Sequence, residues 1–313
     1  MPHGAHSTLS IVVPVLNEER NIFPLYEAVI AVWQELPEYA REIIFVDDGS
    51  TDGTWNGISS LKRKDASVKG IRFARNFGKE SAIEAGLRAA SGDAVITIDG
   101  DLQHPPELIP KMVHAWKAGN DIVRGHHTTI ARHGFPKRAT SFLFYRLFNL
   151  ISDTPIVRGS SDFCLFSRRV VDAFDALPEK QKFHRLLSEW VGFPSASISY
   201  EARERGSGRS AYTLTKLFPL ARRAIVSSAT KPMSAILIIG CILSVLGVVL
   251  TFGLLYYKYF VDYEYIGGAV VLAAFVVFNN GLLFIAFGVM SLYQIAIYRE
   301  VQNRPSYIVR ETV

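Results

Sequence analysis

Residues 94–106 read AVITIDGDLQHPP, an apolar run that ends in a pair of aspartates. The run Ala94–Ile98 predicts a buried strand, because uncharged and β-branched residues are typical of the centre of a sheet. Asp99 and Asp101 follow this strand directly, with Gly100 between them. Acids in this position either begin a polar turn or bind a group of opposite charge.

Similar runs alternate with helix-like segments through the N-terminal half of the chain. The predicted strands are 9–16, 42–46, 68–73, 94–98 and 121–124. The predicted helices are 21–36, a segment capped by Ser50 or Thr51 that runs through Leu61, 81–90 and 106–118. Strands that alternate with helices indicate an α/β domain with a mainly parallel sheet. In open sheets of this kind, ligands bind beyond the carboxyl ends of the strands.

Acidic residues follow three of the predicted strands. Glu18 follows the first strand, Asp47 and Asp48 the second, and Asp99 and Asp101 the fourth. Each group alone fits an ordinary turn or a helix cap. Because parallel strands bring their carboxyl ends to one edge of a sheet, the three groups together favour a binding site.

The fourth strand end has the ligand chemistry of a hard metal ion. Asp99, Asp101 and Gln103 offer oxygen ligands within a short span. Such ligands suit Mg²⁺ or Mn²⁺, whose shells are usually completed by water and substrate phosphates. A metal at this turn would neutralise a departing diphosphate.

Two other strand ends suit the remainder of a nucleotide. A carboxylate at Asp48 can accept hydrogen bonds from a base or a ribose, although a helix cap and a tight turn explain the same residues. Lys79, after the third strand, can reach a phosphate, and a solvated basic turn is the alternative. The sequence contains no GxxxxGK[ST] motif, which excludes a P-loop ATPase.

The C-terminal third is dominated by two stretches without a charged residue, 234–256 and 265–298. A helix needs about 20 apolar residues to cross a bilayer, so both stretches predict transmembrane helices, with buried core helices as the alternative. The short link between them allows only a hairpin, and basic residues at both outer flanks place both termini in the cytoplasm. We therefore predict a multi-pass protein of the inner (cell) membrane.

The charge pattern and the cysteines restrict the partners and the compartment. The net charge of +5 is modest, and no basic run is interleaved with aromatic residues, so nucleic acid is not an expected partner. Cys164 and Cys241 fall in different predicted regions, which fits a reducing compartment without a disulfide. No signal peptide is predicted within residues 1–10.

Residues 213–231 connect the two parts of the chain. They combine an apolar helical face with basic residues, which predicts an amphipathic helix at a membrane surface. The predicted organisation is a catalytic domain at 1–212, this juxtamembrane helix at 213–231, two transmembrane helices at 232–298 and a cytoplasmic tail at 299–313.

Four motifs occur in a fixed order in the N-terminal part: PVLNEE (14–19), VDDGSTDGT (46–54), RNFGKESAIEAGL (75–87) and DGDLQHPPELIP (99–110). They resemble those of family 2 inverting glycosyltransferases with the GT-A fold. More narrowly, they resemble the polyprenyl-phosphate glycosyltransferases, which include dolichol-phosphate mannose synthase, bactoprenol glucosyltransferases and undecaprenyl-phosphate aminoarabinose transferases. The segments SSDFCLFSRRVVDAF and RGSGRSAYTLTKL and the C-terminal spans extend the resemblance over nearly the whole chain.

The resemblance implies a donor site built from the strand ends. Matching positions assign contacts with the nucleotide to Pro14, Glu18, Asp47 and Asp48, and Lys79 is the further donor-binding residue expected from its place after the third strand. They assign Asp99, Asp101 and Gln103 to a Mg²⁺ or Mn²⁺ ion and to the diphosphate of a UDP- or GDP-sugar.

The resemblance also implies catalytic and acceptor residues. Asp162 matches an acid often described as the catalytic base, and Asp101 is the second expected catalytic residue. Arg205, Ser210 and Tyr212 match an RxxGxSxY segment that closes near the site, where Ala211 replaces the lysine of many relatives. By analogy with relatives of this shape, the chain is expected to form tetramers.

Charge decides what the acceptor requires. A phosphomonoester has a second pKa of ~6, so at neutral pH it is already deprotonated and scarcely needs a general base. Asp162 is therefore expected either as a base or as an orienting group, with a hydrogen-bonded loop carboxylate as the plain alternative. Two anions that react must be held by cations, and Arg124, Arg138 and Arg205 are the candidates, although each also fits a solvated surface residue.

The sequence thus predicts inverting transfer of a sugar from a nucleotide-sugar to a polyprenyl (undecaprenyl) phosphate at the cytoplasmic membrane face, for modification of cell-surface glycan or lipid. A processive polysaccharide synthase is one alternative, but the sequence lacks a QxxRW motif and the additional spans of that class. A non-catalytic membrane scaffold is the other, and the intact DGDLQ motif argues against it. The sequence does not distinguish the sugar or the nucleotide.

Overall fold

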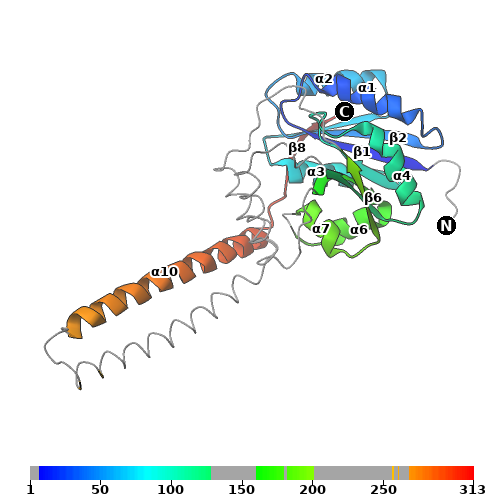
Figure 1. The fold of residues 1–313 in the computed structure, drawn as a ribbon. Helices are drawn as coiled ribbons and strands as arrows, with labels where there is room; N and C mark the ends of the chain where they lie inside the picture. Colours follow the sequence, from blue (N-terminus) through cyan, green and yellow to red (C-terminus); the bar gives the residue numbers. More distant parts are fainter. Residues whose placement is uncertain (1–6, 128–159, 180–181, 201–255, 257–259, 261–267) are drawn as a thin grey trace, which may run out of the picture. The chain divides into compact units, whose positions relative to one another are not determined.

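The computed structural model describes residues 7–127, 160–179, 182–200, 256, 260 and 268–313 (Figure 1). The chain divides into two compact units. The first contains 1–147, 154–214 and 304–313, and the second contains 148–153 and 215–303.

An eight-stranded sheet forms the centre of the first unit, in the order β7-β5-β6-β4-β1-β2-β3-β8. Its strands are β1 (Thr8–Val15), β2 (Ala40–Asp47), β3 (Val68–Phe73), β4 (Ala94–Thr97), β5 (Ile122–His127), β6 (Ser160–Ser167), β7 (Ser195–Tyr200) and β8 (Val309–Thr312). The pairs β1–β2, β1–β4, β2–β3 and β5–β7 are parallel, whereas β6 is antiparallel to both of its neighbours and β8 is antiparallel to β3. The predicted α/β fold with a mainly parallel sheet is confirmed.

Helices cover both faces of this sheet (Figure 1). They are α1 (Ile22–Trp33), α2 (Thr54–Lys64), α3 (Lys79–Ala89), the 3₁₀ turn η1 (Pro106–Leu108) with α4 (Ile109–Lys117), α6 (Arg168–Ala176) and α7 (His184–Trp190). One core cluster joins α1, α2 and α4 to side chains such as Ile43 and Phe45, and the other joins α3 and α6 to side chains such as Ile44 and Val46. Because successive residues of β2 point to opposite covered faces, residues 43–46 of this strand are all apolar instead of alternating with polar residues.

Strand β8 lies in the predicted tail 299–313, which therefore contributes to the sheet. Gly70 of β3 and Val313 exchange two backbone hydrogen bonds of 2.9 Å. The Tyr307 ring stacks on Phe73 with centroids 4.9 Å apart. These contacts cover the edge of β3, which would otherwise expose unpaired backbone groups.

The second unit is described mainly by α10 (Gly268–Val301), a helix of 34 residues. Among the residues that the structure describes, no helix combines the length and the apolar character needed to cross a membrane. The predicted multi-pass localisation in the inner membrane is therefore wrong for this part of the chain. In the sequence, Asn279 and Asn280 interrupt the apolar stretch that α10 contains, and polar residues are costly in a segment that spans a bilayer. The predicted helix 213–231 and nearly all of the first apolar stretch lie outside the described residues.

Candidate active site

The antiparallel pairing of β4 with β6 brings two acids together. In this register Thr97 lies opposite Cys164. Asp99 lies two residues after Thr97, and Asp162 lies two residues before Cys164. The antiparallel register therefore places these two carboxylates side by side. The Thr97 hydroxyl donates a 2.6 Å hydrogen bond to the Asp162 carbonyl and holds the strands together at this point.

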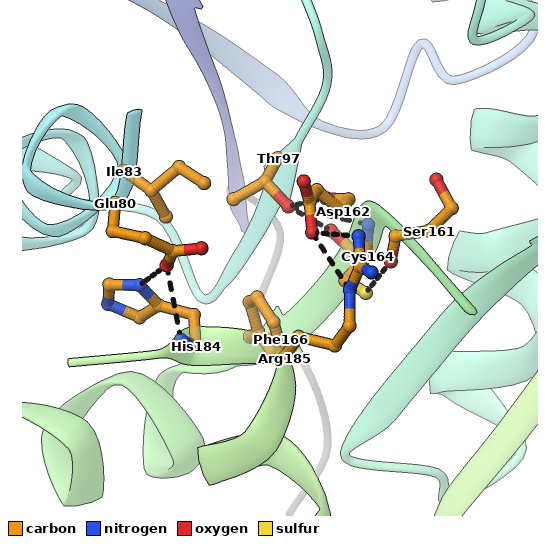
Figure 2. A pocket seen from close by; sticks show the side chains of 9 residues that line it. All are labelled: Glu80, Ile83, Thr97, Ser161, Asp162, Cys164, Phe166, His184 and Arg185. Carbon is orange, nitrogen blue, oxygen red and sulfur yellow. Dashed lines mark hydrogen bonds and ion pairs between the residues drawn. The ribbon is translucent and has the colours of Figure 1, made fainter. Parts of the chain in front are cut away.

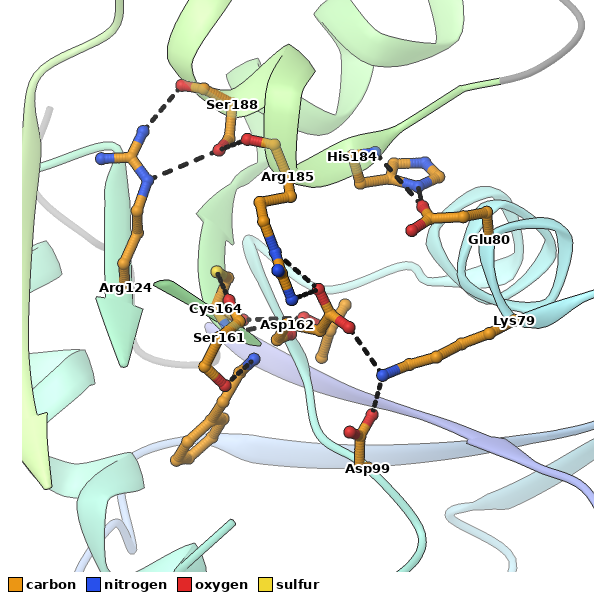
Figure 3. A network of polar contacts seen from close by, with 12 residues as sticks. Lys79, Glu80, Asp99, Arg124, Ser161, Asp162, Cys164, His184, Arg185 and Ser188 are labelled. Atoms are coloured by element: carbon orange, nitrogen blue, oxygen red, sulfur yellow. Dashed lines mark hydrogen bonds and ion pairs between the residues drawn. The ribbon is translucent and has the colours of Figure 1, made fainter. Parts of the chain in front are cut away.

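A lysine bridges the two carboxylates (Figure 3). Lys79 is the first residue of α3, and its Nζ lies 2.6 Å from Asp99 Oδ1 and 2.7 Å from Asp162 Oδ2. Arg185 of α7 approaches Asp162 from the other side, with Nη2 at 2.6 Å and Nε at 3.1 Å from Oδ1. Two cations thus converge on Asp162, and one of them is shared with Asp99.

This cluster fixes the charge of its members. Burial would raise the pKa of the Asp162 carboxyl, but the charges of Lys79 and Arg185 outweigh burial and hold that pKa well below its usual range. Burial would lower the pKa of Lys79, but Asp162 and Asp99 raise it above its usual range. Asp162 is therefore an anion at any physiological pH, and a carboxylate stabilised to this extent is a weak base.

The turn after β4 is shaped by backbone geometry. A Cβ atom at Gly100 would lie 2.7 Å from Cγ1 of Val15, so only glycine allows this turn to approach the end of β1. Leu102 has a φ of 63°, in the left-handed region. The Asp101 carboxylate accepts a 3.1 Å hydrogen bond from the backbone N–H of Gln103. The turn therefore presents its two acids from a tightly bent loop.

His104 stabilises this turn through contacts of both of its ring nitrogens. Its Nδ1 accepts a 3.1 Å hydrogen bond from the Asp99 N–H, and its Nε2 lies 2.9 Å from the Ser161 hydroxyl. The ring stacks on Phe163, and burial lowers its pKa, so the imidazole is neutral with its proton on Nε2. His104 was not among the predicted site residues, because a histidine in a loop carries no signal of its partners.

The donor set of this turn fits a divalent metal. Among the described residues, no cluster of three or more His, Cys, Asp or Glu side chains forms a metal site by itself. Asp99 and Asp101 supply two carboxylates, and the Asp99 side chain is 26 % exposed and already in contact with a cation. A site with few protein ligands, completed by Gln103, water and substrate oxygens, is the arrangement that Mg²⁺ and Mn²⁺ adopt in proteins.

The acids that follow β2 have different partners. Asp47 is fully buried, accepts a 2.8 Å hydrogen bond from the Ser50 N–H and lies 3.3 Å from Nε of Arg72. Asp48 accepts hydrogen bonds from the N–H groups of Phe77 and Gly78, at 2.7 and 3.0 Å. Burial raises the pKa of Asp48, and these two hydrogen bonds oppose the rise. Both carboxylates organise loops, and their contact with a nucleotide stays a prediction.

The other predicted nucleotide contacts lie nearby. Pro14 pairs with Val46 in the register of β1 and β2, and its carbonyl oxygen lies 3.4 Å from the position of a Cβ at Gly100. The Glu18 N–H donates a 2.9 Å hydrogen bond to the Thr54 hydroxyl at the start of α2. These residues border the edge of the sheet where the donor was expected, and their binding roles stay predictions.

Behind Asp162 lies a small cavity with a volume of about 10 Å³, which is room for roughly one water molecule (Figure 2). Its lining residues are Glu80, Ile83, Thr97, Ser161, Asp162, Cys164, Phe166, His184 and Arg185. Burial raises the pKa of the Cys164 thiol to about 12, so this cysteine is not a nucleophile. The cavity is too small for a sugar.

Comparison with known proteins assigns the family. The model of "Glycosyl transferase family 2" matches residues 10–174, from β1 through α6. The SfII prophage-derived bactoprenol glucosyl transferase of Shigella flexneri is 39% identical and covers 97% of this chain and 98% of its own. The chain belongs to glycosyl transferase family 2. The uncharacterized glycosyltransferase YkcC of Bacillus subtilis is 36% identical and covers 98% of this chain and 94% of its own.

The fold of this family 2 glycosyltransferase also has a counterpart among solved structures. The crystal structure of a mycobacterial protein matches with a TM-score of 0.50 at 21% identity and covers 70% of this chain and 73% of that chain. At this identity the match concerns the fold alone. The predicted GT-A-like arrangement of a mainly parallel sheet flanked by helices is confirmed, whereas the predicted C-terminal transmembrane hairpin has no support among the described helices.

Of the three arginines predicted to bind the acceptor, Arg124 lies within the described residues. Arg124 of β5 is buried, donates a 2.8 Å hydrogen bond to the Ser188 carbonyl and lies 3.3 Å from the Glu189 carboxylate. It braces α7, the helix that carries Arg185, and its role as a phosphate ligand stays a prediction. The other predicted acceptor residues lie outside the described residues: Arg138, Arg205, Ser210 and Tyr212.

Arg185 is a second residue at this site of the glycosyltransferase, after His104, that the sequence did not predict. It lies 23 positions after Asp162 in the chain, on a helix of seven residues. Its neighbours His184 and Leu186 are buried while its own side chain is 33% exposed. Only the folded arrangement brings it to Asp162.

Proposed function

We propose that this family 2 glycosyltransferase transfers a sugar from a nucleotide-sugar to a polyprenyl phosphate. The observation that carries the proposal is the cluster of Asp99, Lys79, Asp162 and Arg185 at the end of β4, where two cations and two anions meet at a partly exposed edge (Figure 3). Relatives named bactoprenol glucosyl transferases, which match nearly the whole chain, support the lipid acceptor.

The donor diphosphate would lie against the turn after β4. Asp99 and Asp101, with Gln103, would hold a Mg²⁺ or Mn²⁺ ion, and such an ion would stabilise the negative charge of the departing diphosphate. The loop 75–79 would face the same diphosphate, because Lys79 extends from it toward Asp99. Asp48 holds that loop through the N–H groups of Phe77 and Gly78.

The acceptor phosphate would need positive charge more than a base. One of its oxygens attacks the anomeric carbon, the bond from that carbon to the diphosphate oxygen breaks, and the electron pair leaves with the diphosphate. Attack on the face opposite to the leaving group inverts the configuration. Lys79 and Arg185 can hold the two anions close together, and the ionised Asp162 would orient these cations instead of accepting a proton.

A direct assay tests this proposal. The purified full chain is incubated with undecaprenyl phosphate in detergent, with Mg²⁺ or Mn²⁺, and with labelled UDP- and GDP-sugars, of which UDP-glucose is tried first. The expected product is a lipid phosphate that carries one sugar, identified by mass, with inverted configuration by NMR. EDTA is expected to abolish its formation.

A matched pair of variants separates the alternatives. Asp101→Asn is expected to lower transfer by at least about 100-fold while the protein stays folded, and Asp175→Asn, in an exposed ion pair with Arg88, is expected to behave as the wild type. Lipid products with many sugars would instead indicate a polysaccharide synthase. Absence of transfer with every donor, or unchanged transfer by Asp101→Asn, would overturn the proposal.

A further inference from the structure

The contact between Lys79 and Asp99 has a consequence for metal binding. The ammonium lies 2.6 Å from Asp99 Oδ1, one of the two carboxylates that would hold the divalent ion in the function proposed above. A carboxylate oxygen in such a contact is not available to a metal in the same position. A metal that binds Asp99 through Oδ1 therefore requires the side chain of Lys79 to move away from this oxygen.

The backbone of Lys79 is fixed, whereas its side chain is not. Gly78, with a φ of 104°, donates its N–H to Asp48, and its carbonyl accepts a 3.2 Å hydrogen bond from the Ala82 N–H. The Lys79 side chain is 41% exposed and has a flexible stem of four methylenes. The loop is thus anchored at the start of α3 while the ammonium can move between nearby anions.

The two carboxylates depend on Lys79 to different degrees. Asp162 keeps Arg185 when the lysine leaves, with two hydrogen bonds to Oδ1. Asp99 keeps only the neutral His104, whose Nε2 lies 3.9 Å from Oδ2. Among the described residues Lys79 is thus the one charged partner of Asp99, and its departure leaves Asp99 free for another cation.

We propose that Lys79 is a built-in counter-cation that competes with the divalent metal for Asp99 and is transferred to the donor diphosphate. This inference rests on the proposed function. Metal alone binds weakly, because it must displace the ammonium from Asp99. Metal with a nucleoside diphosphate binds tightly, because the diphosphate offers the displaced ammonium new oxygen partners. Lys79 thereby couples metal binding to donor binding, so that the metal is retained mainly when a donor is present.

The test measures Mn²⁺ binding to the full chain without any nucleotide, from the EPR signal of free Mn²⁺. Lys79→Met is expected to bind Mn²⁺ about tenfold more tightly than the wild type, because a competing charge is removed. Lys117→Met is the matched control. Lys117 has a similar exposure of 42% and an ion pair of 2.7 Å with Glu38, on a different helix. It is expected to leave Mn²⁺ affinity unchanged.

The same titration with UDP present tests the coupling. The wild type is expected to gain more Mn²⁺ affinity from UDP than Lys79→Met gains. Lys79→Arg keeps the charge and is expected to bind Mn²⁺ alone as weakly as the wild type. This second variant keeps the test valid if the methionine variant fails to fold.

Two results would overturn the inference: Mn²⁺ affinity of Lys79→Met no tighter than that of Lys117→Met, or tighter binding by Lys79→Arg than by the wild type. These measurements do not involve the lipid acceptor. Altered Mn²⁺ binding together with absence of sugar transfer would thus uphold the role of Lys79 and reject the proposed acceptor.

Discussion

Two strand ends in this domain carry paired acids in similar sequence settings and use them differently. After β2, Asp47 and Asp48 receive hydrogen bonds from the backbone N–H groups of Ser50, Phe77 and Gly78. After β4, Asp99 contacts the ammonium of Lys79. A backbone donor is fixed by the fold, whereas a lysine side chain can be exchanged for another cation. The acids after β2 therefore stabilise the loops of the site, whereas Asp99 after β4 can exchange its lysine for another cation.

The exposure of the acids agrees with this division. The Asp47 side chain is fully buried and that of Asp99 is 26% exposed. Substitutions after β2 should therefore act mainly on stability, and substitutions around β4 mainly on activity.

Asp162→Asn should have an effect on activity comparable to that of Asp101→Asn. It removes the anion that holds Lys79 and Arg185 in place, so we expect kcat to fall roughly 100-fold with little change in thermal stability. Steady-state kinetics at saturating donor provide the measurement.

Because the pKa of Asp162 is held below its usual range, its charge is present above about pH 4 and is lost only as the pH falls through the lowered pKa. If the wild type loses activity between pH 8 and pH 5, the variant should therefore show the same loss. A loss that occurs in the wild type but not in the variant would contradict the assignment of Asp162 as a permanently ionised group.

Among substitutions after β2, Asp47→Ala should have the largest effect on stability. It leaves the Ser50 N–H without its acceptor and Arg72 without its buried partner, so we expect the free energy of unfolding to fall by roughly 2–3 kcal/mol. Urea unfolding followed by circular dichroism measures this change. Glu38→Ala, in an exposed ion pair, is the control and should have no measurable effect. An equally stable Asp47→Ala protein would show that the β2 end is not structural.

Asp48→Asn should have a smaller effect that depends on pH. The amide oxygen can still accept from Phe77 and Gly78, so the fold is retained. Burial raises the folded-state pKa of Asp48 above its unfolded value, so the wild type gains stability as the pH falls from neutral toward the unfolded pKa of about 4. The variant lacks this gain. The free energy of unfolding of the variant, relative to that of the wild type, should therefore be higher at pH 7 than at pH 5. A difference of the opposite sign would contradict the prediction.

Glu311→Gln should have the smallest effect. Glu311 pairs with Arg72 at 2.9 Å, but its side chain is 43% exposed, and surface ion pairs contribute less than about 1 kcal/mol. A slight decrease in melting temperature is expected, together with unchanged Mn²⁺ binding. A large loss of metal or nucleotide affinity would show that β8 reaches the site through Arg72.

The sequence was sufficient for the parts of the fold that depend on local pattern. The five predicted strands match β1 to β5, and the apolar runs of β1, β2 and β4 are buried on both faces of the sheet. It was insufficient for β8, a four-residue strand whose side chains are all exposed and whose pairing with β3 joins distant parts of the chain. Hydrophobic patterning carries no signal for such a strand.

For the site, local motifs located the acids but not their partners. The paired aspartates after β2 and β4 stand out in the sequence, but nothing in it shows that Asp48 accepts backbone hydrogen bonds whereas Asp99 contacts a lysine. Lys79 was expected near a phosphate, but its contact with Asp162 spans 83 positions of the chain. Arg185 required the pairing of β6 and the placement of α7, which depend on tertiary structure.

The place of β8 also has a consequence for the order of folding on the ribosome. Strands β1 to β7 are synthesised before α10, yet the outer edge of β3 receives its partner only after α10 has emerged. During that interval the nascent sheet has an open edge, the type of surface through which incomplete chains associate. Translation that stalls within α10 should therefore yield aggregation-prone intermediates, even though every strand with a predicted acid has already been made.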